Sequence, residues 1–584
     1  MRRAVLFMFL AAWSELLLSA QVQKESARQF TVEVFSTRQV RSLTITPLGK
    51  NEWIRPCRSC PKKPVTASFA FNQHSAEAEF GGVFLLRANG EANGVSAAGI
   101  WRLRNTREGP QVLLTLDSER YVALALSGEA APNEPMESLK AMAVTIRTYA
   151  LENAGRHARE GFDLCDSTHC QALRLGSIPP QIEEAVRATA GETLWYGSNR
   201  ATAFYTQNCG GETETAKNVW PQLQAPYLAA HSDPYCIRHA SSAWHAELAL
   251  ADVQAIFRNE GWRLPERLNG VSITKHTPEG RALEVEFVGA DARIPVSASS
   301  FRFAVNRRLG WNQLRSDWYT VTLKNGTLIF NGKGYGHGVG LCQAGSFQMA
   351  VEGRAYREIL NFYFPGTRVG IGADDHGWQL GQGSGWTLQS TTASAEFLQR
   401  GNAAWGKAQM LFPPRKPLQP MVRQFPTTEL FRQSTNEAGW TLAATRGNEI
   451  DLQPESVLQK KGREEATLLH EFLHALIDQE ASPQAPLWLR EGVVEALAES
   501  SAEYLHQKQR INTGGLDAAL AHPSSLAQSQ RAHTDAAILV HTLISRYGLD
   551  QTRQWLRSGS LPEPVMAGLA SQTPLEARPS SSLR

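Results

Sequence analysis

The segment from Tyr121 to Gln171 constrains this chain more than any other part of the sequence. It reads YVALALSGE, then a proline-rich bend, then SLKAMAVTIRTYAL and, further on, DLCDSTHCQ. The apolar first run predicts a strand that delivers one carboxylate, Glu129, to a loop. Helical spacing predicts that the next run is a helix with one buried face, formed by Leu139, Met142, Ala143, Ile146, Tyr149 and Ala150. An acid at a strand end, braced by a packed helix, suits an enzyme site; the alternative is an ordinary exposed glutamate.

A group of soft and borderline metal ligands ends this segment. Cys165, His169 and Cys170 lie within six residues, and His157 precedes them as a candidate fourth ligand. A His-Cys pair that follows a cysteine favours zinc, and the alternative is a disulfide between Cys165 and Cys170 with a free His169. Four protein ligands leave no open coordination position, so we expect this zinc to stiffen the loop and not to perform chemistry.

The segment also carries a family resemblance, together with three later motifs. These are AVRATAGETL (185–194), YTQNCGGET (205–213) and GKGYGHGVGLCQAG (332–345). In this order the motifs resemble the stage II sporulation protein D family, which shares its domain with the amidase enhancer LytB. The resemblance implies a lytic transglycosylase that cuts peptidoglycan glycan strands, with Glu129 as acid and base and a histidine similar to His157 at the zinc. One departure is Ala130, where the family usually has methionine.

The bulk composition limits the classes of protein to consider. A length of 584 residues suggests about three or four domains. The hydrophobic and charged fractions, 42% and 20%, are those of a folded soluble protein. A net charge of +3 gives no electrostatic support for nucleic-acid binding, and we expect none.

The first residues predict export. Residues 1–20 contain Arg2 and Arg3, an apolar run and LSA before Gln21, which is typical of a secretory signal peptide. The run is short for a membrane span and is interrupted by Glu15, so we expect no stable transmembrane segment after cleavage; an uncleaved anchor is the alternative. The expected location is periplasmic or extracellular, associated with the cell wall, where disulfides persist.

Residues 21–113 are expected to form a β-rich region, because apolar and polar residues alternate there between glycine and asparagine turns. Cys57 and Cys60 form a CxxC pair between prolines. No thioredoxin-like context surrounds this pair, so a local structural disulfide is the favoured interpretation over a redox site.

Residues 114–370 are expected to form the α+β core. A disulfide between Cys209 and Cys236 is one interpretation of the remaining cysteines, with Cys342 left unpaired and buried. The glycine-dense segment 332–345 lacks the spacing of phosphate-binding loops. It is expected to present its side chains to a carbohydrate groove, although a purely structural turn is the alternative. The residues assigned to substrate binding are Arg147, Gly210, Gly211, His337 and Gln343.

A polar, glycine-rich stretch, 371–386, is expected to be a linker to a mainly helical domain, 387–584. In LLHEFLHALID, His470 and His474 are four residues apart and share one face of a helix. Glu471 between them is the expected catalytic base of a metallopeptidase, and Glu491 is the expected third zinc ligand, with Glu495 as the alternative. The WLREG pattern resembles gluzincin-type peptidases over about residues 389–569; a chance core helix is the competing interpretation.

Together these features predict a multidomain α+β protein that is exported and has two catalytic sites. Its core would cut peptidoglycan glycan strands, and its C-terminal domain would hydrolyse peptides with a catalytic zinc. Two alternatives remain. The core is a non-catalytic wall-binding module that enhances a cell-wall amidase, or the peptidase domain is the sole enzyme and the front half targets it.

Overall fold

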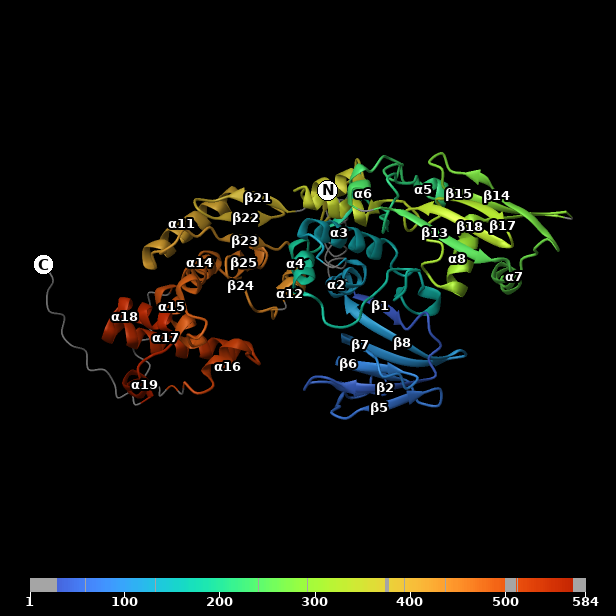
Figure 1. The fold of residues 1–584 in the computed structure, drawn as a ribbon. Helices are drawn as coiled ribbons and strands as arrows, with labels where there is room; N and C mark the ends of the chain where they lie inside the picture. The colour runs from blue at the N-terminus through green and yellow to red at the C-terminus, as the bar shows by residue number, and fades with distance from the viewer. Residues whose placement is uncertain are drawn as a thin grey trace, which may run out of the picture. The chain divides into compact units, whose positions relative to one another are not determined.

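The computed structural model describes residues 29–570, apart from residues 58, 132, 240, 291, 373–377, 393, 436, 499–510 and 512. Its internal contacts divide the chain into two compact units, Met1–His376 and Gly377–Arg584 (Figure 1). The expected signal peptide, residues 1–20, lies outside the described residues. Every helix within the described part of the chain is too short or too polar to cross a lipid bilayer.

The first unit begins with a nine-stranded sheet, which confirms the expected β-rich start. Its path runs β4-β3-β6-β7-β8-β1-β9, with β2 and β5 paired beside β6. Alternate residues of β1 are buried, as period-two patterning predicts. The strands are β1 (Gln29–Val34), β2 (Ser42–Pro47), β3 (Trp53–Arg55), β4 (Lys63–Pro64), β5 (Phe69–Asn72), β6 (Ala78–Ala88), β7 (Val95–Thr106), β8 (Gly109–Asp117) and β9 (Leu164–Cys165).

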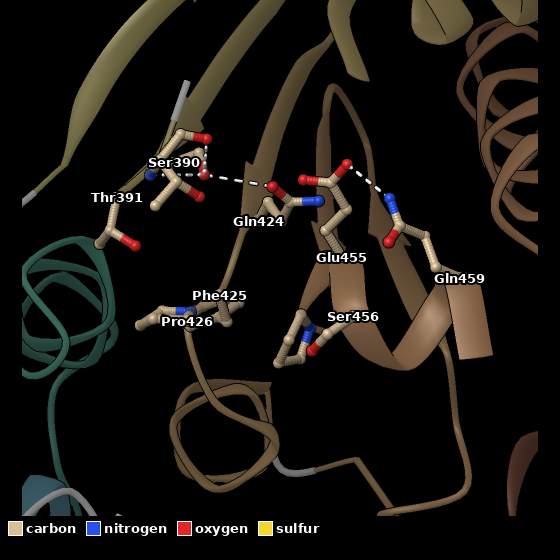
Figure 2. A pocket seen from close by; sticks show the side chains of 10 residues that line it. Ser390, Thr391, Gln424, Phe425, Pro426, Glu455, Ser456 and Gln459 are labelled. Carbon is tan, nitrogen blue, oxygen red and sulfur yellow. Dashed lines mark hydrogen bonds between the residues drawn. The ribbon is translucent and has the colours of Figure 1, made fainter. Parts of the chain in front are cut away.

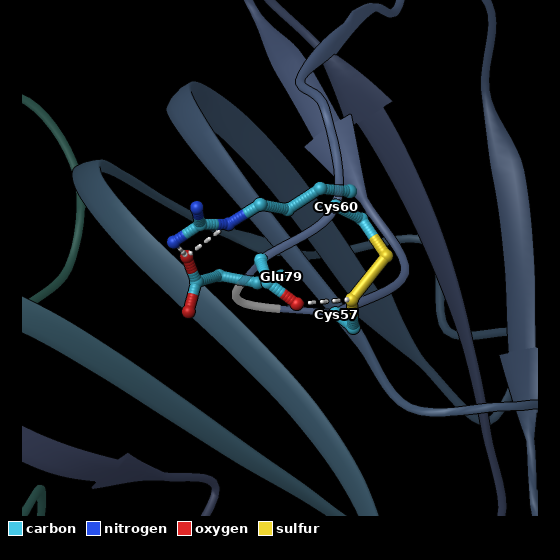
Figure 3. Close-up of a disulfide and its surroundings, with 5 residues drawn as sticks. Cys57, Cys60 and Glu79 are labelled. Atoms are coloured by element: carbon cyan, nitrogen blue, oxygen red, sulfur yellow. Dashed lines mark hydrogen bonds and ion pairs between the residues drawn. A yellow bond between two sulfur atoms is a disulfide. The ribbon is translucent and has the colours of Figure 1, made fainter.

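The local disulfide predicted from the CxxC pair is confirmed. Cys57 and Cys60 are bonded to each other in the loop between β3 and β4, near Glu79 of β6 (Figure 3). The bond closes a loop of the sheet.

The prediction of a strand before Glu129 is wrong, because the chain forms helix α2 (Ser118–Glu129) there. Asp117 caps the helix by accepting a hydrogen bond from the Arg120 backbone N–H at 2.8 Å. The run YVALALSG is alanine- and leucine-rich and is buried on nearly all sides. Such a continuous apolar run has no period that separates a buried strand from a buried helix. Glu129 is consequently the last residue of a helix.

The predicted helix after Glu129 is confirmed as α3 (Met136–Glu152). All six residues of the predicted face are buried, but the expectation of a single buried face is wrong, because every residue from Ala141 to Ala150 is buried. The helix packs against α2, α4 (Pro180–Ala188), α9 (Gln343–Val351) and α10 (Tyr356–Tyr363). Around this helical core lie short elements: the 3-10 helix Ala158–Glu160, β10 (Thr193–Tyr196), β11 (Asn199–Arg200), β12 (Tyr205–Thr206), α5 (Ala216–Val219), α6 (Pro234–His239), β19 (Leu341–Cys342) and β20 (Arg368–Gly370).

A second apolar core lies within the segment that the sequence assigned to one core. Between β12 and β19 the chain builds two three-stranded sheets and two helices around their own hydrophobic cluster. The elements are β13 (Ala243–Ala249), α7 (Leu250–Asn259), β14 (Leu268–His276), β15 (Ala282–Gly289), β16 (Arg293–Ser297), α8 (Ala298–Leu309), β17 (Tyr319–Lys324) and β18 (Thr327–Lys333). Parallel pairing of β12 with β19 then brings Thr206 opposite Cys342 across this insertion.

The second unit was expected to be mainly helical. It contains a five-stranded sheet in addition to its helices, and the sequence did not predict this sheet. The strand order is β21-β22-β23-β25-β24, with β24 antiparallel at one edge. The strands are β21 (Gln379–Gln382), β22 (Thr387–Ser390), β23 (Met421–Gln424), β24 (Ala443–Arg446) and β25 (Glu449–Leu452). The helices are α11 (Ala395–Leu411), α12 (Thr428–Thr435), α13 (Glu455–Lys460), α14 (Glu464–Glu480), α15 (Leu487–Ala498), α16 (Leu516–Ala521), α17 (Leu526–Tyr547), α18 (Leu549–Ser558) and α19 (Glu563–Ala570).

Part of the expected linker belongs to this sheet. Strand β21 and the turn after it fall within 371–386, and Trp386 is fully buried. A Cβ at Gly383 or Gly401 would meet the Trp386 ring at 2.3 Å. Gly383, one of the glycines that suggested a linker, therefore makes room for an indole in the core.

A cavity of about 420 Å³ opens at the carboxyl ends of the parallel strands β22, β23 and β25 (Figure 2). Its lining includes Ser390, Gln424 and Glu455. Ser390 donates a hydrogen bond to Gln424 Oε1, and Gln459 donates one to Glu455, whereas Gln424 Nε2 is buried without a hydrogen-bond partner among the described residues.

Candidate active site and metal centres

Glu129 is a half-buried carboxylate with three hydrogen-bond donors around it. The Tyr205 hydroxyl donates to Oε1 at 3.2 Å, and the Gln343 amide lies 3.5 Å from Oε2. The backbone N–H of Ala172 is the third donor. Burial raises the pKa of Glu129, and these hydrogen bonds only partly oppose the shift. The group is thereby biased towards the protonated form that a general acid requires.

A line of side chains holds the Tyr205 hydroxyl in place. The Tyr121 hydroxyl donates to Oε1 of Gln171 at 3.0 Å, and the Gln171 amide lies 3.5 Å from the Tyr205 hydroxyl. Burial raises the pKa of Tyr205 well above its usual value, and the charge of Glu129 adds to this effect. Tyr205 is therefore a neutral donor to Glu129 at any ordinary pH.

Gly128 explains why glycine precedes the candidate acid. A Cβ at this position would lie 2.5 Å from the carbonyl oxygen of Ala172. The close approach of the two backbones brings the Ala172 N–H within reach of Glu129. A side chain at Gly128 would push the helix end away from this loop.

The His-Cys site, defined as His157, Cys165, His169 and Cys170, is one of three groups in the described part of the chain whose ligand atoms lie within 4.8 Å of one another. Cys170 Sγ lies 3.5 Å from His157 Nε2, and Cys165 Sγ lies 3.7 Å from His169 Nδ1. Both cysteines are free, so the alternative of a disulfide between them is wrong in this structure. Two thiols and two imidazoles are a donor set that fits zinc.

The residues assigned to substrate binding have different surroundings in the structure. Gln343 contacts Glu129, as described above. Arg147 is almost completely buried, and its guanidinium donates to Glu119 at 2.9 Å from Nε and 2.6 Å from Nη2. Its remaining donor reaches the Glu192 carbonyl at 3.1 Å. We therefore leave Arg147 out of the residues proposed to touch a substrate, because its donors are committed to the core.

His337 packs edge-on against the rings of Phe204 and Trp220, which stack on each other. Its Nδ1 accepts a hydrogen bond from the Val339 N–H at 3.0 Å, which leaves the proton on Nε2. Burial, with the charges of Arg302 and Arg281 adding to it, lowers the pKa of His337 to about 3. This imidazole is therefore neutral and can donate from Nε2 only.

The predicted Cys209–Cys236 disulfide is wrong, because both sulfurs belong to a larger group. The three-cysteine site comprises Cys209, Asp233, Cys236 and Cys342. The three cysteines form no disulfide, and all four residues are fully buried. The sequence could not predict this group, because Cys342 is brought to the other two cysteines only by the pairing of strand β12 with strand β19.

Gly210 and Gly211 face this group through their backbones. Both residues have positive φ, at 80° and 96°. Hydrogen bonds from Cys209 and Cys342, followed by those from the N–H groups of the two glycines, outweigh burial and lower the pKa of Cys236 to about 2. Both backbones are buried beside the cysteine sulfurs in this structure, whereas the sequence predicted that these glycines contact a sugar.

In the second unit, α14 and α15 bring the HExxH and WLREG motifs together. The C-terminal histidine site, defined as His470, His474 and Glu491, has its ligand atoms within 4.8 Å. The two Nε2 atoms are 3.1 Å apart, and His474 Nε2 is 3.3 Å from Glu491 Oε2. Glu491 Oε2 is buried and accepts no hydrogen bond from the described residues. A buried carboxylate oxygen without a donor, aimed at two imidazoles, fits a metal ligand.

Glu471 projects from the same helix towards the edge of the sheet. The Thr445 hydroxyl, on the edge strand β24, donates to Glu471 Oε2 at 2.7 Å. This contact fixes the carboxylate beside the C-terminal histidine site without placing it among the ligand atoms. The arrangement fits a base that acts on a metal-bound water.

His533 of α17 is a site residue that the sequence did not reveal. Its Nδ1 lies 3.0 Å from Glu495 Oε1 and 3.7 Å from Glu491 Oε2. Glu495 is thus engaged by His533, whereas the ligand atom of Glu491 lies with the two histidines. No spacing relates His533 to the earlier motifs, because packing of α17 on α15 brings it there.

The close packing of these two helices explains the glycine of WLREG. A Cβ at Gly492 would lie 2.4 Å from both the Ala536 carbonyl oxygen and a methyl of Val540 on α17. Only glycine permits this approach, and the approach places His533 against the glutamates of α15.

Comparison with known proteins identifies the family of the first unit. Residues 106–196 match the family model described as "Stage II sporulation protein" (SpoIID). An uncharacterized protein of Brachyspira hyodysenteriae is 30% identical over 260 residues, which are 44% of this chain and 68% of that protein. In this region the chain belongs to the SpoIID family. The expected recognition of that family is thus confirmed for the first unit.

Two named relatives come from Bacillus subtilis. The stage II sporulation protein D is 25% identical over 284 residues, covering 45% of this chain and 77% of that protein. The amidase enhancer is 25% identical over 283 residues, and the chain spans only 39% of its length. These SpoIID relatives support a cell-envelope protein with a cell-wall-related function.

A solved structure matches part of the chain weakly. The M1 zinc metallopeptidase from Deinococcus radiodurans aligns with 43% of this chain and 55% of its own, at 15% identity and a TM-score of 0.19.

Proposed function

We propose that the first unit cleaves the glycan strands of peptidoglycan, with Glu129 as the single acid and base. The observation that carries this proposal is the burial of Glu129 beside two side-chain donors, which raises its pKa. The groups that shift this pKa include no second carboxylate. One carboxylate suffices if the sugar itself supplies the nucleophile.

In the proposed reaction, protonated Glu129 gives its proton to the glycosidic oxygen as the bond to the anomeric carbon breaks. The resulting carboxylate then takes the proton of the 6-hydroxyl on the same sugar. The 6-oxygen bonds to the anomeric carbon and closes a 1,6-anhydro ring. Glu129 ends the cycle protonated, and no water is consumed. Tyr205 and Gln343 stabilise the carboxylate between the two proton transfers.

The test is mass spectrometry of muropeptides released from purified peptidoglycan. We expect the full chain to release anhydro-ended sugars and the Glu129→Gln variant to lose this release by about 10²–10⁴-fold. Cleavage at the wild-type rate in that variant would remove Glu129 from the mechanism.

A specific observation also supports the alternative function, enhancement of a partner amidase. One relative is named an amidase enhancer, and Ala130 follows Glu129 where the family usually has methionine. If the chain releases no sugars but accelerates a cell-wall amidase, and Glu129→Gln accelerates it equally, this alternative is correct.

For the second unit we infer a zinc-dependent peptidase. His470, His474 and Glu491 would hold the metal, which when bound supplies an activated water. Glu471, held by Thr445, would accept the proton of that water. His533, whose pKa is raised by its hydrogen bond to Glu495 and by the charges of Glu491 and Glu495 against the opposing effect of burial, would donate to the developing oxyanion. Cleavage of generic peptides by the wild-type chain, lost in Glu471→Ala with zinc retained, supports this assignment. Equal cleavage by both chains would contradict it.

A further inference from the structure

The three-cysteine site draws together residues from three separate segments. Cys209 lies in the loop after β12, Asp233 and Cys236 lie at the start of α6, and Cys342 ends β19. All four residues are 0% exposed. Their ligand atoms lie within 4.8 Å of one another, as do those of the His-Cys site.

Asp233 is a buried carboxylate that lacks a cation among the described residues. It accepts hydrogen bonds from the Tyr363 hydroxyl at 2.9 Å, from the Cys236 N–H at 2.9 Å and from the Cys209 thiol at 3.2 Å. No lysine, arginine or histidine in the described part of the chain forms an ion pair with it. A buried carboxylate without a positive partner is costly, and a bound dication would supply the missing charge.

Backbone N–H groups are directed at the sulfurs. The Cys209 N–H donates to Cys342 Sγ at 3.2 Å, and the Gly211 N–H is directed at Cys236, while the Gly210 N–H donates to Asn208 Oδ1 at 2.9 Å. Donors of this kind surround metal-bound thiolates and hold them in their charged form.

We propose that the three-cysteine site binds a zinc ion through its three sulfurs and the Asp233 carboxylate. In a tetrahedral site with Zn–S distances of about 2.3 Å, neighbouring sulfurs lie roughly 3.7 Å apart, within the span found here. The inference is independent of the proposed glycan cleavage and adds a second structural metal to the first unit.

The proposed metal ligand Cys342 lies next in sequence to a residue that donates a hydrogen bond to Glu129, and opposite the strand that carries the other donor. Cys342 lies opposite Thr206 in the β12–β19 pair. The next residue after Cys342 is Gln343, and the residue before Thr206 is Tyr205; these two side chains contact Glu129. The ion would therefore clamp the two strands that present both donors.

The first test is metal analysis of the full chain, prepared without chelators. We expect Cys342→Ser to contain one equivalent of zinc less than the wild type. Tyr363→Phe is the matched control, because it removes a hydrogen bond to Asp233 but no ligand atom, and it should keep all its zinc. Equal zinc in the wild type and a folded Cys342→Ser chain would overturn the proposal.

Because loss of a buried ligand can unfold a chain, the second test leaves the three-cysteine site intact. A chain with Cys165→Ser and Cys170→Ser has no thiolate at the His-Cys site, so sulfur-to-cobalt charge-transfer absorption after Co²⁺ loading must come from the remaining cysteines. We expect that absorption to persist. Its absence, or an intact mass that shows a second disulfide, would show that these cysteines hold no metal.

Discussion

At the scale of single residues, burial sets the chemistry of Glu129. A raised pKa in the folded state means that folding favours the protonated carboxyl. The stability that this group contributes is full below the unfolded pKa, near 4.5, and is lost as the pH rises through the folded value. The candidate acid therefore destabilises the fold at neutral pH.

Replacement by an uncharged amide should relieve this cost. We expect Glu129→Gln to melt at a higher temperature than the wild type at pH 7, and at the same temperature below pH 4, where the wild-type carboxyl is also neutral. Thermal melts at both pH values check this. A variant that is less stable at pH 7 would mean that Glu129 is held by favourable interactions of its charged form.

Tyr205→Phe tests the donor that opposes this shift. The Tyr205 hydroxyl lowers the pKa of Glu129, so its loss should move that pKa further upwards. We expect the fall of glycan cleavage with rising pH to occur at higher pH in the variant, together with a lower maximum rate. A pH profile that stays in place would show that Tyr205 does not act through Glu129.

Arg147 shows how a sequence pattern and a structural role diverge. Its buried ion pair with Glu119 predicts that Arg147→Ala destabilises the chain by about 3–5 kcal/mol, because it leaves a buried carboxylate alone. Chemical denaturation measures this cost. Arg38→Ala, which breaks an exposed pair with Glu91, is the control and should change stability little. A folded Arg147→Ala chain of normal stability and weakened glycan binding would restore the substrate-binding role.

At the scale of elements, the distance between α15 and α17 defines the second unit's site. Gly492→Ala should force the helices apart and cost about 1–3 kcal/mol. It should also lower zinc affinity, since the strain would displace the adjacent zinc ligand Glu491 and separate His533 from the glutamates of α15. Gly406→Ala is the matched control. This glycine lies inside α11 with open space around it, so alanine should be neutral or stabilising by up to about 1 kcal/mol. Denaturation and zinc titration distinguish the two variants.

The elements also show what the sequence could predict. The alternation of the first sheet, the helical face of α3 and the ligand spacings of the HExxH motif are local, and each appears in the structure. Helix α2 was misassigned because its run is apolar on every side. Tyr205, Asp233 and His533 could not be assigned, because only tertiary contacts bring them to their sites.

At the scale of the whole molecule, each unit has its own apolar core. The core of the second unit draws all its residues from Trp386 onwards. The C-terminal histidine site likewise takes no ligand from the first unit. Each part of the chain therefore contains what its proposed chemistry needs.

We expect residues 377–584, expressed alone, to fold and to bind one zinc ion. In this piece Glu471→Ala should keep the metal, Glu491→Ala should lose it, and Glu495→Ala should weaken it only by freeing His533. Circular dichroism and metal analysis provide the measurements. A folded piece without zinc affinity would leave the first unit as the only candidate enzyme.

The contacts of Glu129 also bear on the order in which the chain folds. Tyr205 lies 76 residues and Gln343 lies 214 residues from Glu129 along the chain. Contacts with such large sequence separation close long loops and form late. A chain that has not yet placed the β19 segment has a water-exposed Glu129 with an ordinary acidity. The proposed glycan cleavage would therefore begin only after the segment that contains Gln343 has been synthesised and folded.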